Sequence, residues 1–299
     1  MKYEYILENP EHPVSRWANR LQISKSGYYA WFKSREIRKE REVHTRQRIR
    51  EEFDKGRKTY GPDRIVKELR KSGEKVGRRR CVTYMADMGL KSIHARCRSK
   101  SLTDSRKARG ADYPNIFRYE SFPIVPRMGL VSDITYLRTG EGFMYYCMVK
   151  DVVTGEVLGD HMSERMTSEL AVKAMSSVIA RHRLENGCIF HSDRGSQYTS
   201  KALMELLSRN GIRQSFSRVG MPGDNSWSES FFATMKKELT HWTFHRTKES
   251  IRASVFEYVY CFYNGIRIQK KLGYLSPRQY FNTIQMDGIG ATMAGKMAA

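Results

Sequence analysis

Three acidic residues occupy positions that suit catalysis. Asp133 interrupts an otherwise apolar segment, where a carboxylate is costly unless it is paired or bound to a metal ion. Asp193 ends the segment Cys-Ile-Phe-His-Ser-Asp just before a turn, and Glu229 follows the loop Gly-Met-Pro-Gly-Asp-Asn. Mg²⁺ and Mn²⁺ prefer oxygen ligands, and carboxylates from separate elements can bridge two such ions. The three acids therefore predict a two-metal site that activates an attacking hydroxyl and stabilises a leaving oxygen.

Each acid taken alone is also compatible with a purely structural role. A single Asp in a strand is more often a cap or an ion-pair partner than a metal ligand. Asp151, which follows a second apolar segment, is interpreted as structural. His191 alternates onto the same strand face as Asp193, so a core role and a supporting role in the site both stay open. The sequence has no Ser–His–Asp order and no GxxxxGK[ST] phosphate loop that would compete with metal chemistry.

The segments around these acids alternate between strand and helix patterns. Strands are predicted at 129–137, 143–153, 157–162, 188–193 and 212–217, and helices at 167–183, 201–210, 226–239 and 248–263. This order is typical of a mixed α/β layer. The end of a strand is where open α/β sheets usually present functional groups, which suits the position of Asp193.

The first 95 residues have helical patterns and many basic residues. Segment 13–32 predicts two short helices around a turn, with Ser24 capping the second, so that Lys25 lies at a helix N-terminus that favours phosphate. Further helices are predicted around Ile49 and Phe53, from Pro62, and from near residue 77. The last of these carries three consecutive arginines, Arg78, Arg79 and Arg80. They form either a DNA contact or a solvated basic face.

The charge balance favours the DNA contact. The chain has 53 Lys and Arg against 32 Asp and Glu, a formal net charge of +21 and a pI near 9.8. Such an excess attracts polyanions, and phosphate neutralisation supplies most non-specific DNA affinity. The 299 residues suffice for about two domains of the usual size of roughly 100–200 residues.

The cysteines and the hydropathy pattern indicate a soluble protein of the cytoplasm. The five cysteines are scattered and form neither a CxxC zinc pair nor a regular disulfide framework. The N-terminal residues lack the apolar stretch of a signal peptide, and no run approaches the ~18 apolar residues of a membrane span.

Several motifs recur together in one known family. They are SDITYL at 132–137, HSDRGSQYTS at 191–200, Asp224-Asn225 with ESFF at 229–232, Lys236, Tyr263-Asn264 with Arg267, and LGYLSP at 272–277. From residue 130 to residue 280 the chain closely resembles the OrfB transposases of the insertion-sequence-3 family. Those proteins belong to the retroviral-integrase superfamily. Residues 45–90 also resemble the helical domain that precedes the core in that family.

The resemblance implies a function and a site. Between Asp193 and Glu229 there are 35 residues, as in the DD(35)E signature, so Asp133, Asp193 and Glu229 are implied as catalytic ligands of two Mg²⁺ ions, with Mn²⁺ able to substitute. Lys236, two helical turns after Glu229, would hold a DNA phosphate. The other implied or expected DNA contacts are Lys25, Arg78, Arg79, Arg80, Asn225 and Arg267.

The implied fold is an α/β RNase-H-like core, a mixed five-stranded sheet flanked by helices, preceded by helix-turn-helix-type regions. The expected divisions are a helix-turn-helix-like segment (1–40), a helical DNA-binding domain (41–95), a basic linker (96–118), a catalytic core with a C-terminal helix (119–285) and a flexible tail (286–299). The implied activity is 3′-end cleavage and strand transfer. The implied partners are double-stranded DNA, further copies of the chain on DNA and an upstream-frame OrfA product, in the bacterial cytoplasm at the nucleoid.

One position departs from the family pattern, and two alternatives remain. The family usually has Tyr-Asn-x-x-Arg-x-His, and this chain has Gln269 at the His position, which puts a proton-transfer role there in doubt. The alternatives are another RNase-H-fold nuclease and a non-catalytic DNA-binding regulator derived from a transposase. The basic N-terminal region argues against the first alternative, and the presence of all three acids argues against the second.

Overall fold

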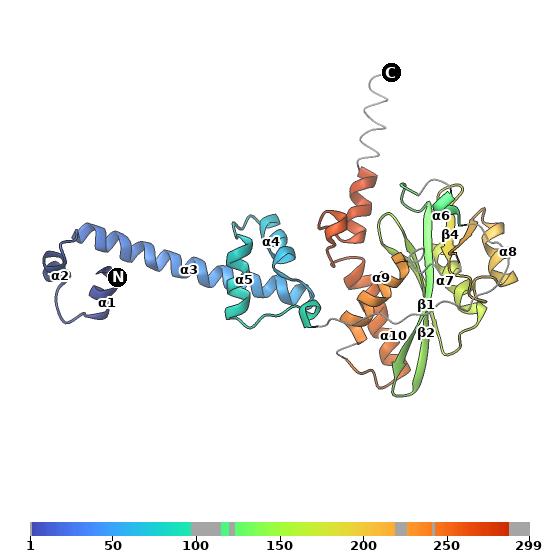
Figure 1. Cartoon of the computed structure of the whole chain (residues 1–299), viewed down its shortest axis with the longest axis horizontal. Helices are drawn as coiled ribbons and strands as arrows, with labels where there is room; N and C mark the ends of the chain where they lie inside the picture. Colours follow the sequence, from blue (N-terminus) through green and yellow to red (C-terminus); the bar gives the residue numbers. More distant parts are fainter. Residues whose placement is uncertain (1, 97–114, 120–122, 219–225, 241–242, 287–299) are drawn as a thin grey trace, which may run out of the picture. The chain divides into compact units, whose positions relative to one another are not determined.

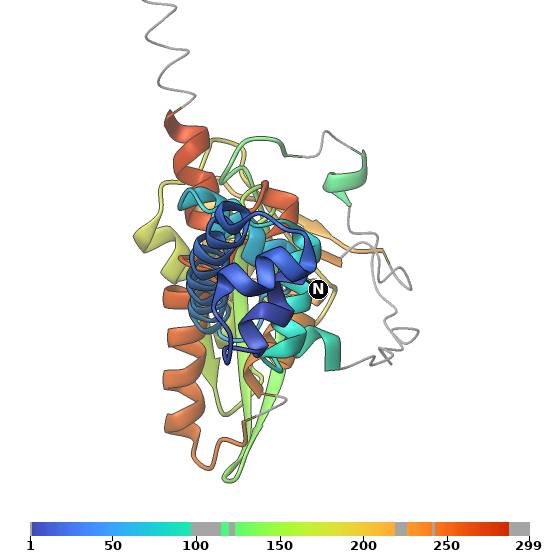
Figure 2. The same cartoon turned by 90° about the vertical axis from the view of Figure 1, so that its left-hand side faces the viewer.

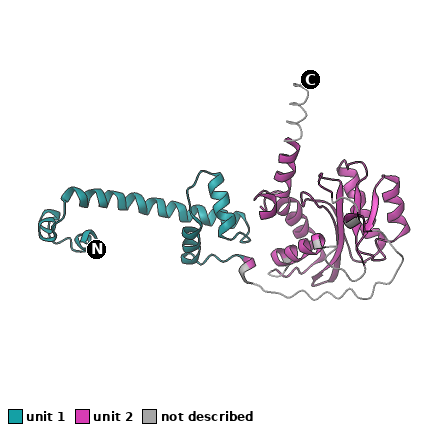
Figure 3. Cartoon of the chain, turned by 45° about the horizontal axis from the view of Figure 1, so that its top comes forward, with its two compact units in different colours: residues 1–92 teal, residues 93–299 magenta. Residues whose placement is uncertain are grey.

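The computed structural model describes residues 2–96, 115–119, 123–218, 226–240 and 243–286. The chain divides into two compact units, residues 1–92 and 93–299 (Figure 3). The division at residue 92 lies shortly before the predicted linker, 96–118, of which residues 97–114 are outside the described residues. The predicted tail also lies outside them, apart from residue 286.

Unit 1 is helical throughout. Its helices are α1 (Lys2–Glu8), α2 (Val14–Leu21), α3 (Lys25–Lys55), α4 (Pro62–Lys71) and α5 (Arg78–Asp87). Ser24 caps α3 as predicted, because its hydroxyl accepts a hydrogen bond from the Gly27 N–H at 3.3 Å. Pro62 opens α4, also as predicted, in the first-turn position where its missing N–H costs nothing.

Helix α3 is longer than the sequence pattern predicted. It runs for 31 residues through the segment where two separate helices were expected, so the expected boundary between residues 40 and 41 lies inside it. The middle of α3 has almost no apolar face, but it is rich in Arg, Lys and Glu, which are good helix formers. Pairs one turn apart, such as Arg46 with Glu42 at 2.8 Å, add to this local preference. Periodicity of apolar residues therefore could not reveal this part of the helix.

Each end of α3 packs into its own apolar cluster. At the start, Tyr28 packs with Ile6 and Trp17 from α1 and α2. Towards the end, Ile49 and Phe53 are buried with apolar residues of α4 and α5. These residues are Ile65, Val66, Leu69, Cys81 and Met85.

Unit 2 is built on the predicted mixed five-stranded sheet. Its strands are β1 (Gly129–Thr139), β2 (Gly142–Asp151), β3 (Val157–Ser163), β4 (Ile189–Ser192) and β5 (Arg213–Phe216). They lie in the order β3-β2-β1-β4-β5, with β1, β2 and β3 antiparallel and β1, β4 and β5 parallel. The fold class expected from the sequence is confirmed, and the strand ends differ from the prediction by one or two residues.

Helices cover both faces of the sheet (Figure 1). Alternating side chains such as Leu130, Cys147 and Phe190 point to one face and pack under α7 (Ser168–Arg181) and α8 (Lys201–Arg209). The other face, with Leu137 and Met148, packs under α9 (Ser226–Met235) and α10 (Lys248–Phe256). Short elements complete this unit: η1 (Ile93–Arg96), α6 (Ile116–Tyr119), η5 (Lys270–Leu272) and a helical stretch at 277–286.

Helices α9 and α10 each continue as a π-helix, η3 (Lys236–Thr240) and η4 (Glu257–Tyr263), where a single α-helix was predicted. The tip of the β1–β2 hairpin lies beside the segment that precedes α10 (Figure 2). There the Gly140 N–H donates to the His245 carbonyl at 3.0 Å, and the Lys248 N–H donates to a Glu141 carboxylate oxygen at 2.8 Å. Within the described ranges, no helix has the length and apolar character needed to cross a membrane.

Candidate active site

The pairing of β1 with β4 places two of the predicted acids side by side. The strands run parallel, with Gly129 opposite Ile189 and Val131 opposite His191. Continuing this register by two positions brings Asp193, directly after β4, level with Asp133 in β1. Both side chains project from the sheet face that α9 covers, because they share the alternation of Val131.

Backbone N–H groups orient both carboxylates. The Ile134 N–H donates to Asp133 Oδ1 at 2.8 Å, and the Gly195 N–H donates to Asp193 Oδ1 at 3.0 Å. A Cβ at Gly195 would lie 3.0 Å from that same oxygen, so a side chain there would press on the Asp193 carboxylate. The turn thus keeps one oxygen of Asp193 hydrogen-bonded while the residue remains exposed.

Glu229 lies in the first turn of α9, above the same face. Phe231 is buried against the sheet, and Trp227 packs on the cluster that contains Val131. The negative charge of Glu229 contributes to the raised pKa of Asp133, so Glu229 lies within electrostatic range of Asp133. Lys150 of β2 fixes the start of α9 by donating a hydrogen bond from Nζ to the Trp227 carbonyl.

The acids influence one another electrostatically. Burial raises the pKa of Asp133, repulsion from Asp193 and Glu229 raises it further, and the result is about 7 despite the opposing effects of the Ile134 N–H and Lys236. Desolvation also raises the pKa of Asp193 and of Glu229. Ionisation of Asp133 beside the other two acids is therefore unfavourable without a nearby cation.

The donor chemistry of this cluster suits a divalent metal ion. It consists of carboxylate oxygens, which Mg²⁺ and Mn²⁺ prefer, and their mutual repulsion is what a bound cation would relieve. As placed, however, no three His, Cys, Asp or Glu side chains in the described part of the chain converge closely enough to hold a metal ion. The loop before α9, residues 219–225, is outside the described residues. It includes Asn225, one of the predicted DNA contacts.

Lys236 lies beside these acids. Its Nζ is 4.8 Å from the centroid of the Tyr136 ring, and the negative charge of Asp133 raises its pKa against the larger lowering effect of burial. The residue is half-buried at the junction of α9 and η3. This position suits the predicted contact with a phosphate next to the acids.

His191 and Asp151 have structural roles. His191 is fully buried, with Nδ1 2.8 Å from Ser215 Oγ and Nε2 3.2 Å from Ser217 Oγ, and its ring stacks on Phe117 of α6. This decides between the two roles left open by the sequence, since both ring nitrogens are engaged in the core. Asp151 accepts hydrogen bonds from three backbone N–H groups and so organises the turn after β2, as expected.

Arg267 is not placed to contact DNA. Its guanidinium is buried and donates from Nε and Nη2 to the carboxylate of Glu238 in η3, at 2.7–3.0 Å. The sequence motif therefore reflects a structural ion pair, and we remove Arg267 from the predicted DNA contacts. Gln269 is also buried, and its backbone pairs with Leu275.

Two residues near the site were missed by sequence reasoning. Lys150 is a buried amine near the end of a largely apolar strand, the same signal that drew attention to Asp133. Glu238 gave no such signal, because an acid near the end of a basic helix is usually exposed. Its carboxylate accepts hydrogen bonds from Arg267 and Tyr258 and lies 2.6 Å from His94 Nε2.

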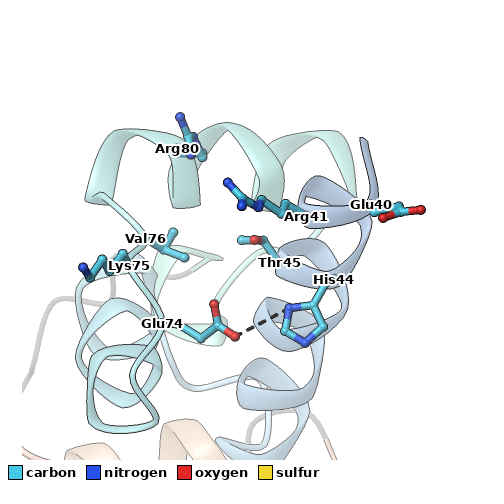
Figure 4. A pocket seen from close by; sticks show the side chains of 8 residues that line it. All are labelled: Glu40, Arg41, His44, Thr45, Glu74, Lys75, Val76 and Arg80. Carbon is cyan, nitrogen blue, oxygen red and sulfur yellow. Dashed lines mark ion pairs between the residues drawn. The ribbon is translucent and has the colours of Figure 1, made fainter. Parts of the chain in front are cut away.

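The predicted DNA contacts of unit 1 are exposed. Lys25 begins α3, and Arg78, Arg79 and Arg80 begin α5, where Arg78 also pairs with Asp63 at 2.7 Å. Arg80 borders a pocket between α3 and the segment that joins α4 to α5 (Figure 4). The residues that line this pocket are Glu40, Arg41, His44, Thr45, Glu74, Lys75, Val76 and Arg80.

Comparison with known proteins identifies the family. Residues 126–222 and 229–283 match sequence profiles that are both described as integrase core domains, and residues 39–98 match an HTH-like domain. The chain is 32% identical to transposase InsF of insertion sequence IS3A from Escherichia coli K12, over 94% of this chain and 99% of the relative. The chain belongs to the insertion-sequence-3 transposase family.

A further relative and a solved structure are also similar to this chain. A 31 kDa protein of insertion element IS600 from Shigella sonnei is 35% identical, over 86% of this chain and 94% of its own length. Among solved structures, the catalytic core domain of BIV integrase covers 55% of this chain and 99% of that chain, at 14% identity and a TM-score of 0.41. As a member of this transposase family with an integrase core, the chain is an insertion-sequence transposase and a polynucleotidyl transferase.

Proposed function

We propose that this transposase cleaves and joins DNA strands with two divalent metal ions, and that Asp133, Asp193 and Glu229 are its catalytic ligands. The observation that supports the proposal is the β1–β4 register, which directs Asp133 and Asp193 to the same end of neighbouring strands, where repulsion from Asp193 contributes to the raised pKa of Asp133. Two Mg²⁺ or Mn²⁺ ions bound there would stabilise charge on the attacking and leaving oxygens.

The reaction consists of two in-line displacements at phosphorus. In the first, water attacks a phosphodiester at the transposon end, and the bond to the 3′ oxygen breaks to leave a free 3′-OH. In the second, that 3′-OH attacks a phosphodiester of the target, whose own 3′ oxygen leaves. Neither step needs a covalent enzyme intermediate or ATP. The protein's share is to position the strands, with Lys236 holding a phosphate beside the acids.

Unit 1 supplies much of the DNA affinity in this proposal. Its exposed basic residues at the starts of α3 and α5, Lys25 and Arg78–Arg80, suit phosphate contacts. We further propose that the chain acts on the double-stranded DNA of the transposon ends and the target, at the bacterial nucleoid. It would do so as a homo-oligomer assembled on DNA, together with an upstream-frame OrfA product.

Amide variants test the site. Asp133→Asn, Asp193→Asn and Glu229→Gln each keep the size of the side chain and remove a charge that the metal ions require. Each variant should lose both cleavage and strand joining on oligonucleotides that carry the transposon ends. DNA binding without metal should hold or tighten, because a negative charge near phosphate has been removed. Chelation should stop the wild-type reaction, Mn²⁺ should restore it, and Ca²⁺ should support binding with little chemistry.

A matched control separates the site from general charge effects. Glu169 lies in the first turn of α7 and is exposed, as Glu229 is in α9, so Glu169→Gln should keep full activity. Asp151→Asn should also keep activity in samples that remain folded. A near-wild-type joining rate in any of the three amide variants would remove that residue from the site. Cleavage by the wild type without any joining would instead favour a nuclease.

A further inference from the structure

An exposed aromatic pair lies at the end of β1 beyond the acids. Tyr136 is 60% exposed and Phe143 of β2 is 50% exposed, although both are large apolar side chains on a sheet. Their rings meet at right angles with centroids 5.6 Å apart. They share one face of the sheet, because Tyr136 and Arg138 alternate onto the same face and Arg138 is directly opposite Phe143. The hairpin thus presents two rigid rings to solvent.

The position of this pair ties it to the proposed site. Tyr136 is three residues after Asp133, about 10 Å along an extended strand, and alternation starts its side chain from the opposite face of the sheet, at the edge of β1. Within the described residues, the pairing of β1 with β4 ends at Val131, so the edge of β1 that carries Tyr136 has no neighbouring strand on that side. Lys236 spans this edge, since its Nζ lies 4.8 Å from the Tyr136 ring while its charge interacts with Asp133.

The charges around the rings favour a nucleic-acid ligand. Lys236 and the exposed Arg138 flank the rings with positive charge, which suits a phosphate backbone. Every nucleobase has a flat face that can stack on an aromatic side chain, whatever the sequence. By contrast, the exposed ring of Phe256 in α10 lies 5.1 Å from Tyr260, whose hydroxyl donates to the carboxylate of Asp160. A carboxylate beside the rings would repel a phosphate backbone, so the exposure of an aromatic pair alone does not indicate a nucleic-acid-binding surface.

We propose that Tyr136 and Phe143 form a stacking platform for an unpaired nucleobase of the DNA strand next to the scissile phosphate. This proposal rests on the proposed function, since it assumes that DNA reaches the three acids. The platform would hold a base that has left the duplex while Lys236 holds the phosphate beside it. It would thereby favour DNA ends that are frayed or single-stranded over intact duplex.

Binding without metal tests the platform independently of catalysis. The full chain would be titrated in chelator with a blunt duplex and with the same duplex carrying a short single-stranded extension, which contains 2-aminopurine. We expect tighter binding of the extended duplex and quenching of the 2-aminopurine fluorescence, because stacking on a ring quenches it. Tyr136→Ala and Phe143→Ala should each lose about 5- to 150-fold of affinity for the extended duplex, the usual effect of removing one stacking ring. Affinity for the blunt duplex should stay the same.

Three further variants define the outcome. Tyr136→Phe keeps the ring and should restore both preference and quenching, whereas Phe256→Ala removes an equally exposed ring elsewhere and should change neither. Asp133→Asn should keep the quenching while it loses cleavage, so failure of the platform and failure of the proposed function are distinguishable. Quenching that persists in both alanine variants, or is absent in the wild type, would overturn the platform. A change of oligomeric state in the alanine variants without DNA would also overturn it, because the rings would then belong to a protein interface.

Discussion

The carboxylate of Glu238 and the guanidinium of Arg267 form a buried ion pair at the end of the helical segment that carries Glu229. Their side chains are 1% and 7% exposed, and the shortest distance between them is 2.7 Å. Burial alone would raise the pKa of Glu238, but the hydrogen bond from His94 and the charge and hydrogen bonds of Arg267 lower it to about 2. Since Glu238 lies in η3, this pair fixes the end of the segment that begins with α9.

Glu238→Gln should therefore destabilise the protein by about 3–5 kcal/mol, because it leaves the Arg267 charge buried without a partner. Thermal unfolding of the full chain at pH 7 would measure this loss. Glu205→Gln breaks exposed pairs with Lys201 and Arg209 and should cost less than about 1 kcal/mol. Equal losses in the two variants would contradict the ion-pair explanation. The double variant Glu238→Gln with Arg267→Met should recover part of the stability.

The same pair gives a pH dependence. The folded-state pKa of Glu238 is lowered from 4.5 to about 2. The ionised carboxylate therefore makes its full contribution to the free energy of unfolding above pH 4.5, and this contribution is lost as the pH falls through 2. The stability gap between the wild type and Glu238→Gln should narrow as the pH is lowered from 5 towards 2. Denaturant unfolding of both proteins across that range would measure this difference in the free energy of unfolding. A difference that stays constant with pH would show that the pair is not ionised in the folded protein.

Lys150 should make stability depend on pH in the alkaline range. Burial, and to a smaller extent repulsion from Lys271, lowers its folded-state pKa from 10.5 to about 7. The free energy of unfolding is therefore highest above pH 10.5, where the amine is neutral in both the folded and the unfolded protein, and it falls as the pH is lowered towards 7. Relative to Lys150→Met, the wild type should gain stability between pH 7 and pH 10, by at most about 5 kcal/mol at 1.36 kcal/mol per pKa unit. Parallel stability curves for the two proteins would show that Lys150 titrates normally.

Asp133→Asn should stabilise the metal-free protein at pH 8. The folded-state pKa of Asp133 is raised from 3.8 to about 7, so its ionisation costs stability as the pH rises through this range, and the amide removes that cost. The gain should shrink towards pH 4. Added Mg²⁺ should raise the melting temperature of the wild type more than that of the variant. A melting temperature that responds equally to Mg²⁺ in both proteins would exclude Asp133 as a ligand.

Arg79→Gln with Arg80→Gln should weaken DNA binding at all sequences alike. Removing one contact to a phosphate should reduce the slope of log affinity against log salt by about 0.9, so removing both should change it by nearly 2. Lys201→Gln with Arg209→Gln removes two exposed cations of α8 and serves as the control, with no change of slope expected. An unchanged slope in the α5 variant would mean that these arginines are a solvated face.

Gln269→His should keep strand-transfer activity within about tenfold, ~1.4 kcal/mol of barrier. Gln269 is buried, so no contact to DNA depends on the amide. Rates for the two proteins across pH 6–8 would reveal whether the imidazole introduces a titration. A much larger loss would show that the surroundings are specialised for glutamine.

The sequence predicted the parts of the fold that depend on local alternation. Five strands and their flanking helices followed from apolar periodicity. Asp133 was identifiable because a carboxylate in an apolar strand is costly unless it is paired or bound to a metal ion. The long helix α3 was not predictable in this way, because charged residues form its middle and bury nothing. Arg267 was misassigned because a motif does not reveal that its partner, Glu238, lies 29 positions away in the chain. Pairings of that kind depend on tertiary packing, which periodicity does not report.

The length of α3 sets a scale for how unit 1 can engage a duplex. At about 1.5 Å per residue, its 31 residues extend for roughly 46 Å. One turn of DNA is about 34–36 Å, so the two ends of this rod are farther apart than one turn of the double helix. Lys25 begins the rod, whereas Arg80 of α5 lines a pocket together with Arg41 and His44, which lie 16 and 19 residues further along α3. The two basic sites are therefore separated by roughly 24–29 Å along the rod, less than one turn of DNA, so α3 sets a spacing that a duplex of a single turn can bridge.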